Sequence, residues 1–489
     1  MLIVKSQVMK KYLIIATLFL SIFNLNAQNK DYELWSFETN DRIYSNPQIH
    51  GNTLYFGCND NTFYAIDANN GDELWQYQIN TYIQSGSTIV DSIIFFEAGN
   101  NCYALNKDTG EEIWIYVNND SQGEEKLDNW DYHHATPVID DSLVYFGLGN
   151  GSMLGIEIAT GNIKVQTSAV DSVPIRSTPV VNDGILYFGD WDGKAYAYDI
   201  NANEILWTRN TYVGPPPYET FGMLNTKMLV YDSMLIMGAR NPRIYALNAY
   251  TGNPEWIFEV SDGGWISGDP YIENDTLYIG GSDCHKLFAL DVHTGDLFWD
   301  YMFLYNNFSQ PKVCGDYVLF TTGNAYANNG TNYGHGYLYA VNKFDGSLKN
   351  FSRIGGNLFT TPIFHNGQII VGSDDKHIYS LDSISFVSTY VNIEETGINS
   401  VVDPKFYPNP FKDSITISYD LVLPTKVTII IYSWSGQEIK RSHTEKRTVG
   451  EYEFLWDGKD QQNNEVSPGA YVVEIHSKMV STSQVIIKQ

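Results

Sequence analysis

Cysteine, proline and positive charge are all scarce in this sequence. Its 489 residues include 4 Cys and 17 Pro, and 30 Lys+Arg stand against 57 Asp+Glu, for a formal net charge of −27. So few cysteines exclude a scaffold built on disulfides. The acidic balance excludes a general binder of nucleic acids or anionic membranes, because such partners need a basic surface.

Long hydrophobic runs are absent too, apart from one near the start. Residues 12–23 are apolar, Lys10 and Lys11 precede them, and Ala27 follows. This order is typical of a secretory signal peptide, which we place at residues 1–28 with Met9 as the more natural start. A buried N-terminal helix is the alternative. No other run is long enough to span a bilayer, so no transmembrane segment is predicted.

Aromatic residues and glycine, in contrast, are abundant. The chain has 35 Tyr and 40 Gly, and 43% of its residues are hydrophobic, which is enough for a large core. Two short strand-like boxes recur. The first is LYFG 54–57, IFFE 94–97, VYFG 144–147, LYFG 186–189, LIMG 235–238, LYIG 277–280, VLFT 318–321 and IIVG 369–372. The second is YAID 64–67, YALN 103–106, LGIE 154–157, YAYD 196–199, YALN 245–248, FALD 288–291, YAVN 339–342 and YSLD 379–382.

Each pair of boxes lies in the same local pattern. A residue that is usually Pro precedes the first box, and short turns such as residues 50–52, 182–184 and 366–367 separate the strands. Four antiparallel strands that repeat in this way are typical of a propeller blade. The sequence therefore predicts an all-β protein in which residues 29–383 form an eight-bladed β-propeller of four-stranded antiparallel blades.

The ends of the repeat array raise the question of how the ring closes. The segment around Trp35 precedes any complete repeat, whereas the last repeat, which ends at Asp382, lacks a clear fourth strand. We expect the N-terminal strand to complete the last blade, because no sheet edge then stays open. Residues 385–390 are the alternative, although they lack the Gly and the Trp of the other repeats.

A longer motif links the second box to the fourth strand. The pattern Ala-x-Asp/Asn-x-x-x-Gly-x-x-x-Trp occurs at residues 65–75, 104–114, 246–256 and 289–299, and residues 197–207 keep all of it except the Gly. We expect the Gly to allow a turn with positive φ and the Trp to pack between neighbouring blades. The motif resembles the tryptophan-docking repeat of the quinoprotein (PQQ-like) propellers. This resemblance implies a fold and no particular chemistry.

The last part of the chain follows another pattern. After a linker at residues 384–402, residues 403–489 contain short alternating strands with Gly and Asp-Gly turns, which predict a small immunoglobulin-like β-sandwich. The motifs YPNPF 407–411, GQ 436–437, WDG 456–458 and GAY 469–471 resemble, in this order, the type A C-terminal sorting domain of the type IX secretion system of Bacteroidota. An ordinary immunoglobulin-like accessory domain is the alternative.

The two ends of the chain together indicate its route. The resemblance of the C-terminal domain implies export through the periplasm and across the outer membrane by the type IX secretion machinery, and usually removal of the domain afterwards. We therefore expect an extracellular or outer-membrane-surface location for a protein that we expect to be a monomer.

The innermost strands of a propeller begin around the mouth of its central channel. We expect the residue three positions before each Pro-equivalent position at this mouth: Tyr44, Gln84, His134, Arg176, Asn225, Ser267, Phe308 and Phe359. The set mixes polar and aromatic side chains, and it suggests a site for an anionic or hydroxyl-rich ligand. An ordinary channel mouth is the alternative.

Two loops that lead into innermost strands are longer than the others. The loop between residues 114 and 137 contains Trp130, Asp131, Tyr132 and His133, which suit a cation or a stacked sugar ring; a solvated acidic loop is the alternative. The loop between residues 207 and 228 presents Tyr218 and Phe221 beside three consecutive Pro, and its alternative is a rigid brace. Both loops belong to the same face of the propeller, which we call the decorated face because the long loops lie on it.

Known catalytic motifs are missing from the sequence. No CxxCH haem site, G-x-S-x-G, H-E-x-x-H or P-loop occurs. The quinoprotein dehydrogenases that the repeat resembles carry an adjacent Cys pair beside the quinone, and none of Cys58, Cys102, Cys284 and Cys314 is adjacent to another. We therefore predict no cofactor, and we interpret the cysteines as buried small residues.

These observations predict a secreted or cell-surface propeller that binds an extracellular glycan or protein and has no catalysis of its own. The alternative is a secreted enzyme that uses the decorated face. Such an enzyme is either a divergent quinone-dependent oxidoreductase with PQQ and Ca²⁺, or a glycan-active hydrolase or lyase.

Overall fold

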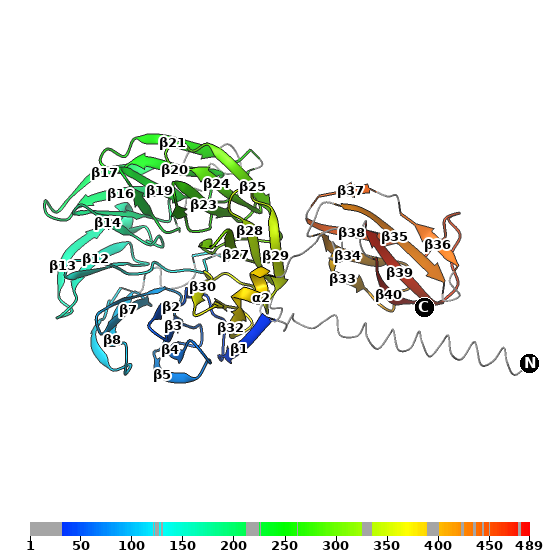
Figure 1. Cartoon of the computed structure of the whole chain (residues 1–489), viewed down its shortest axis with the longest axis horizontal. Helices are drawn as coiled ribbons and strands as arrows, with labels where there is room; N and C mark the ends of the chain where they lie inside the picture. Colours follow the sequence, from blue (N-terminus) through cyan, green and yellow to red (C-terminus); the bar gives the residue numbers. More distant parts are fainter. Residues whose placement is uncertain are drawn as a thin grey trace, which may run out of the picture.

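The protein is all-β, with short strands set around a central axis and a separate, smaller β-sandwich (Figure 1). The computed structural model describes residues 32–120, 122, 127–128, 131–211, 224, 226–261, 263–324, 335–388, 401–421, 425–433, 437–442, 445–448, 450–477 and 481–489. The predicted fold class is confirmed in this respect.

The propeller is built from four-stranded antiparallel sheets, which are its blades. Three of them are β2–β5 (Gln48–His50, Thr53–Gly57, Thr62–Asp67, Glu73–Gln78), β6–β9 (Ser87–Val90, Ile93–Ala98, Asn101–Asn106, Glu112–Tyr116) and β10–β13 (Val138–Asp140, Leu143–Gly147, Ser152–Glu157, Ile163–Ser168). The next two are β14–β17 (Val180–Asn182, Ile185–Gly189, Lys194–Asp199, Glu204–Asn210) and β18–β21 (Leu229–Tyr231, Met234–Gly238, Arg243–Asn248, Pro254–Glu259). They are followed by β22–β25 (Tyr271–Glu273, Thr276–Gly281, Lys286–Asp291, Leu297–Met302) and β26–β29 (Lys312–Cys314, Tyr317–Gly323, Gly336–Asn342, Leu348–Arg353).

The remaining propeller sheet joins the two ends of the repeat array. It has the order β1-β32-β31-β30, with β1 at Glu33–Glu38, β30 at Ile363–His365, β31 at Gln368–Gly372 and β32 at His377–Asp382. The prediction that the N-terminal strand supplies the missing fourth strand is thus confirmed. The alternative is wrong, because Ser383–Ser388 forms a short helix, α2. Near the axis, the Thr361 N–H also donates to Asn46 Oδ1 (2.8 Å).

The recurring spacing of Trp and Gly in the repeats explains how neighbouring blades adhere. Trp75 Nε1 donates to the carbonyl of Lys107 in the next blade (3.0 Å), and Gly110 of that blade has φ +72°. A Cβ on Gly110 would lie 2.6 Å from the Trp75 ring, so the turn needs Gly for its backbone and for this close approach. In one blade Asn203 replaces the Gly, and there the preceding blade carries Val165 in place of Trp.

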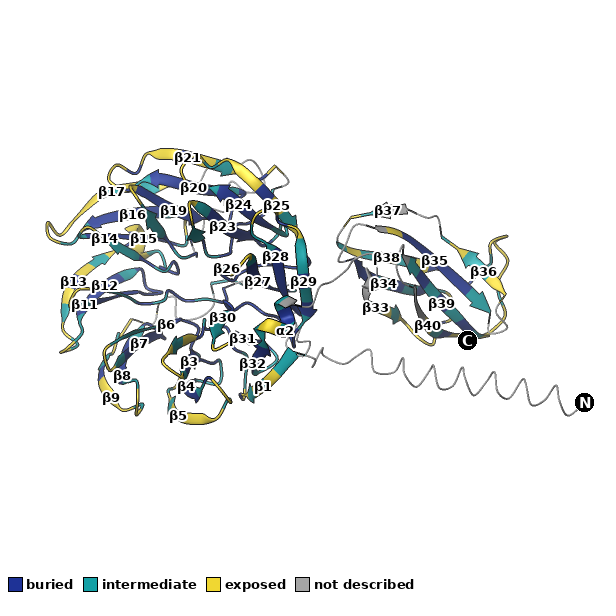
Figure 2. Ribbon diagram, in the orientation of Figure 1, coloured by how far each residue is buried: buried dark blue, intermediate teal, exposed yellow. Residues whose placement is uncertain are grey.

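Burial differs between the strands of a blade, and the innermost strands, such as β14 and β18, are half-buried. Figure 2 shows the second and third strands of the blades mostly buried, whereas the outermost strands β5, β17 and β21 are largely exposed. The four cysteines are free. Cys58 and Cys102 are buried, as predicted, whereas Cys284 and Cys314 are only half-buried. Burial raises the pKa of the Cys58 thiol to about 12, so this thiol is a poor nucleophile at neutral pH.

The C-terminal domain consists of two sheets around a common core that includes Phe411 and Trp456. One sheet has the order β33-β34-β38 (Val401–Tyr407, Ile415–Leu421, Gly450–Trp456), and the other the order β36-β35-β39-β40 (Glu438–Arg441, Thr425–Ser433, Gly469–Ser477, Ser481–Lys488), with β37 (Glu445–Arg447) also paired to β35. The predicted β-sandwich is confirmed.

Candidate functional site at the channel mouth

Each blade receives its innermost strand from a loop that starts at the outermost strand of the preceding blade, which we call the lead-in loop. The predicted channel-mouth residues lie in these loops, usually directly before a Ser or Thr. Ser177 Oγ, next to Arg176, donates to the carbonyl of Gly189 (2.9 Å) and accepts from its N–H (2.8 Å). Thr360, next to Phe359, makes the same pair of bonds with Gly372. The mouth positions are therefore tied to the scaffold of their own blades.

The aromatic mouth residues meet one residue of the long loop. Tyr44, Phe308 and Phe359 form a buried cluster with Tyr132, which we call the aromatic lid. The Tyr132 ring lies 4.7 Å from the ring of Phe359, 5.0 Å from that of Tyr44 and 5.5 Å from that of Phe308, centroid to centroid. These three lead-in residues come from different blades, so Tyr132 fills the space between them.

Two ion pairs anchor the long loop near the lid. Asp131 Oδ2 lies 3.3 Å from Arg176 Nε, and both side chains are buried. Asp128 Oδ2 lies 2.7 Å from Arg240 Nη1. Arg240 is fully buried, and its guanidinium lies 4.5 Å from the Trp191 ring and 5.3 Å from the Trp265 ring. Cation–π contact with these rings stabilises the buried charge.

The electrostatics of these pairs follow from burial and mutual attraction. Burial disfavours the Asp131 carboxylate, but the nearby charge of Arg176, together with His134 and the Leu127 N–H, outweighs it and lowers the pKa of Asp131. Burial lowers the pKa of Arg240, while Asp128 and Asp131 oppose that shift. The long loop is therefore held by the Asp131–Arg176 pair and the Arg240 guanidinium, which have almost no access to water, and by the Asp128 carboxylate, which is partly exposed.

The polar side of the mouth contains buried atoms without partners. His134 Nδ1 lies 2.8 Å from Glu97 Oε2; a carboxylate only accepts, so we assign the proton to Nδ1. Among the described residues His134 Nε2, Gln84 Oε1 and Ser267 Oγ have no hydrogen-bond partner, although all three atoms are buried. Buried polar atoms of this kind indicate a bound water or a small polar ligand.

The outcome for the predicted residues is mixed. Tyr44, Phe308 and Phe359 come together with Tyr132, and Arg176 with Asp131, whereas His134 pairs with Glu97. His133 takes the position that is Ile in other lead-in loops, such as Ile83 and Ile175. Trp130, Tyr218, Phe221 and Asn225 lie outside the described residues.

Sequence reasoning missed Glu97, Trp191, Arg240 and Trp265. One signal was available: the first box ends in Glu97, where most other copies end in Gly. No such signal marks Arg240. It lies 112 positions from Asp128, and the first box before it ends in Gly like most of the others.

A further titratable group lies near the lid. Asp374 accepts from the Asn357 N–H (2.6 Å) and from Asn357 Nδ2 (2.8 Å). Burial raises the pKa of Asp374 to about 6, although these hydrogen bonds and the charge of Arg42 oppose the shift. Arg42 Nη1 in turn donates to Tyr44 Oη (3.4 Å), which connects this carboxyl group to the aromatic lid.

The described residues at the mouth do not fit PQQ with Ca²⁺. A flat tricarboxylate needs an open slot beside available cations, but four rings fill the centre, and Arg176 and Arg240 are paired with carboxylates. In the described part of the chain no three His, Cys, Asp or Glu side chains gather as metal ligands would.

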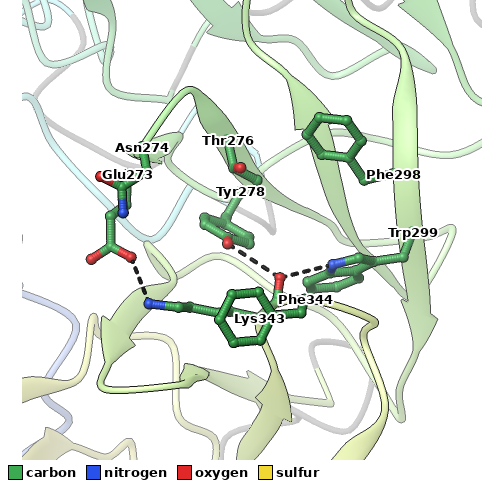
Figure 3. Close-up of a pocket in the computed structure, with 8 residues that line it drawn as sticks. All are labelled: Glu273, Asn274, Thr276, Tyr278, Phe298, Trp299, Lys343 and Phe344. Carbon is green, nitrogen blue, oxygen red and sulfur yellow. Dashed lines mark hydrogen bonds and ion pairs between the residues drawn. The ribbon is translucent and has the colours of Figure 1, made fainter.

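A second concave feature lies between the β22–β25 and β26–β29 blades, and we call it the rim pocket. It has a volume of about 450 Å³, and Figure 3 shows its lining residues: Glu273, Asn274, Thr276, Tyr278, Phe298, Trp299, Lys343 and Phe344. Trp299 Nε1 donates to the Lys343 carbonyl (3.0 Å), the docking contact seen in other blades. Phe298 is 55% exposed and Phe344 70% exposed, so two rings flank the pocket in water.

The blades and the tryptophan-docking contacts define the class of this protein, a PQQ-like β-propeller. A family model described as outer membrane protein assembly factor BamB matches residues 4–211 and 218–303, more than half of the chain, and the chain belongs to this family. A second model, the FlgD Ig-like domain, matches residues 412–479, which agrees with the immunoglobulin-like prediction for the C-terminal domain.

Proteins with different names are similar to this chain. Tetrathionate hydrolase of Acidithiobacillus ferrooxidans is 21% identical over 68% of this chain and 71% of its own length. Outer membrane protein assembly factor BamB of Moranella endobia is 21% identical over 72% of this chain and 90% of its own. BamB from Moraxella catarrhalis has a similar fold (TM-score 0.56, 17% identity, 72% of this chain and 99% of that one).

The quinohemoprotein alcohol dehydrogenase of Comamonas testosteroni is also similar in fold (TM-score 0.56, 11% identity, 72% of this chain and 76% of that one). At such identity these structures support the fold alone. In the described residues, no helix has the length and apolar character needed to cross a membrane.

Proposed function

We propose that this protein is an exported binding module without catalysis of its own, built as a closed ring of eight blades. The observation that carries the proposal is the aromatic lid: Tyr132 fills the channel mouth, and the cations beside it are neutralised by Asp131 and Asp128. A site of this kind presents a firm surface and no open reaction chamber. The partner is an extracellular protein, or else a glycan, that meets the decorated face around Trp130–His133, Tyr218 and Phe221.

Export is the second part of the proposal. A signal peptide at residues 1–28 and a sorting domain of the type IX system at residues 403–489 direct the chain to the outside of a Bacteroidota cell, where it acts as a monomer. The match of the C-terminal domain to an immunoglobulin-like family supports the fold that this role requires.

Two observations favour a second candidate function: the name of one relative, and three buried atoms without partners. Tetrathionate hydrolase is named as an enzyme, and Gln84 Oε1, His134 Nε2 and Ser267 Oγ lack partners among the described residues. A secreted enzyme or small-molecule binder with its site beneath the lid accounts for both.

A ligand screen on residues 29–489 separates the two candidates, because a ligand of the native state raises the melting temperature. We expect no shift and no turnover with PQQ and Ca²⁺, and a shift with a peptide or oligosaccharide of the extracellular medium. Quinone-dependent or hydrolytic turnover would establish the second candidate. For the export part, deletion of residues 403–489 should leave the protein in the periplasm; unchanged appearance in the medium would contradict that part.

A further inference from the structure

One residue of the C-terminal domain is buried where its strand predicts exposure. Along β34, Ile415, Ile417 and Tyr419 point into the sandwich core, so the alternate positions face outward. The outward residues Thr416 and Ser418 are half-buried, but Asp420 is only 7% exposed. A charged side chain on an outward face is buried only if another surface covers it.

The covering surface belongs to the propeller. Tyr305 Oη, in the lead-in loop after β25, donates to Asp420 Oδ2. Burial and the Asp420 charge together raise the pKa of Tyr305, so the hydroxyl keeps its proton and stays a donor. One step along the sandwich sheet, Glu451 pairs with Asp420 in register, and Glu451 Oε1 accepts from Asn324 Nδ2 (3.3 Å).

The propeller side of this contact is one continuous unit. Asn306 and Gly323 exchange two backbone hydrogen bonds (2.9 and 3.0 Å), which brings Tyr305 and Asn324 together. Tyr305 packs on Tyr337 with ring centroids 6.0 Å apart, and its φ of +68° is unusual for a bulky residue. Surrounding contacts must hold such a conformation in place.

The same loop leads directly to the aromatic lid. Asn307 donates to the carbonyl of Thr321 (2.8 Å), and Phe308, the next residue, packs on Tyr132 and Phe359. Only two residues separate the contact with the C-terminal domain from the lid. Figure 1 shows that domain beside the ring, on the side of β25 and β29.

We propose that the propeller carries a docking surface for its own C-terminal domain, with Tyr305 and Asn324 receiving Asp420 and Glu451, and that the docked domain braces the lead-in loop that holds the lid. The linker keeps the two partners at high effective concentration, so a small polar contact is enough to dock them. This inference rests on the proposed function only in that the lid belongs to the binding face, and docking itself is measured without any ligand.

The test uses residues 29–489, with the C-terminal domain still attached, and variants on both sides of the contact. Tyr305→Phe removes the donor and keeps the ring, Asp420→Lys reverses the charge, and Asp420→Asn keeps an acceptor. Glu453→Gln is the matched control, because Glu453 is an outward carboxylate of the same sheet that accepts from Tyr407 Oη (2.8 Å) within its own domain. Hydrogen exchange of residues 303–311, 415–421 and 131–135 and the radius of gyration from small-angle scattering are measured.

We expect Tyr305→Phe and Asp420→Lys to speed exchange at residues 303–311 and 415–421 together, by about tenfold, and to increase the radius of gyration. Asp420→Asn should have a smaller effect, and Glu453→Gln none. Wild-type exchange and size in both strong variants overturn the docking surface. Undocking with unchanged exchange at residues 131–135 overturns the bracing of the lid. A melting curve of each variant identifies any variant that fails to fold. If one of the two strong variants fails to fold, the other, which lies in the other domain, tests the docking surface.

Discussion

The channel mouth and the rim pocket are made from the same repeat, but only the mouth is closed. At the mouth, Tyr132 and Phe359 are buried, the Asp131–Arg176 pair lies out of water, and the Arg240 guanidinium that binds Asp128 is fully buried. At the rim, Phe298 and Phe344 lie exposed on either side of a cavity, and the Lys343–Glu273 pair (3.3 Å) remains partly in contact with solvent. The difference comes from an insertion: the long loop supplies the ring and the carboxylates that close the mouth, whereas short turns leave the rim open.

This comparison shows what each region can contribute to binding. The closed mouth places its charged side chains in a medium of low dielectric, where each charge depends on its partner. Substitutions of these side chains should therefore change mainly the free energy of unfolding. Exposed rings at the rim contribute little to folding, which leaves them available for contact with another molecule. Substitutions in the two regions should therefore differ in their effect on unfolding.

The largest effect is expected from Arg240→Ala. It removes a fully buried guanidinium from Asp128 and from the Trp191 and Trp265 rings, and loss of one partner of a buried pair costs about 3–5 kcal/mol. Denaturant unfolding of the propeller measures it. Arg243→Ala is the control, since its partner Glu259 (3.0 Å) is 53% exposed and the pair, which is open to solvent on that side, should contribute less than about 1 kcal/mol. Equal effects would show that the long loop is not held by buried charge.

Tyr132→Ala should be the next most damaging change, by about 3 kcal/mol, because it opens a cavity among three buried rings. Tyr132→Phe keeps the ring and should lose much less stability than Tyr132→Ala. The same unfolding measurement applies to both. If Tyr132→Ala unfolds like wild type, the lid is not closed in solution.

The free energy of unfolding should also depend on pH through a carboxyl group near the mouth. Burial raises the pKa of Asp374 to about 6, so the folded state holds this proton more tightly than the unfolded state. The unfolding free energy should therefore fall as pH rises from about 4 to about 6, by about 2 kcal/mol from this group. The difference between wild type and Asp374→Asn isolates the effect from other carboxylates. A difference that does not change with pH would contradict the raised pKa.

The smallest effect is expected at the rim. Phe298→Ala and Phe344→Ala should each change the unfolding free energy by less than about 0.5 kcal/mol, because the side chains are exposed. Trp299→Ala in the same pocket is the contrast, since its ring is buried between blades and donates to Lys343. A large loss with either Phe substitution would show that the rim is part of the core.

Much of the fold could be predicted because the sequence signals of each blade lie close together in the chain. The boxes, their turns and the Trp–Gly motif all lie within one repeat. The strand around Trp35 precedes any complete repeat, and the last repeat lacks a clear fourth strand, so the two could be paired from the sequence. The site was harder. Tyr44, Phe308 and Phe359 could be placed at the mouth from their repeat position, but not the meeting of Arg240 with Asp128, because that contact joins a blade to a loop far away in the chain.

The amino-acid sequence by itself determined the blade, the docking contacts and the closing strand, since strand period, turn residues and repeat spacing act over short distances. Only the tertiary structure decided which side chains meet across the axis, that the mouth is closed, and that Asp420 is buried against Tyr305. The physical reason is that these contacts join parts of different repeats and domains. Their distances depend on the closed ring as a whole and not on any single repeat.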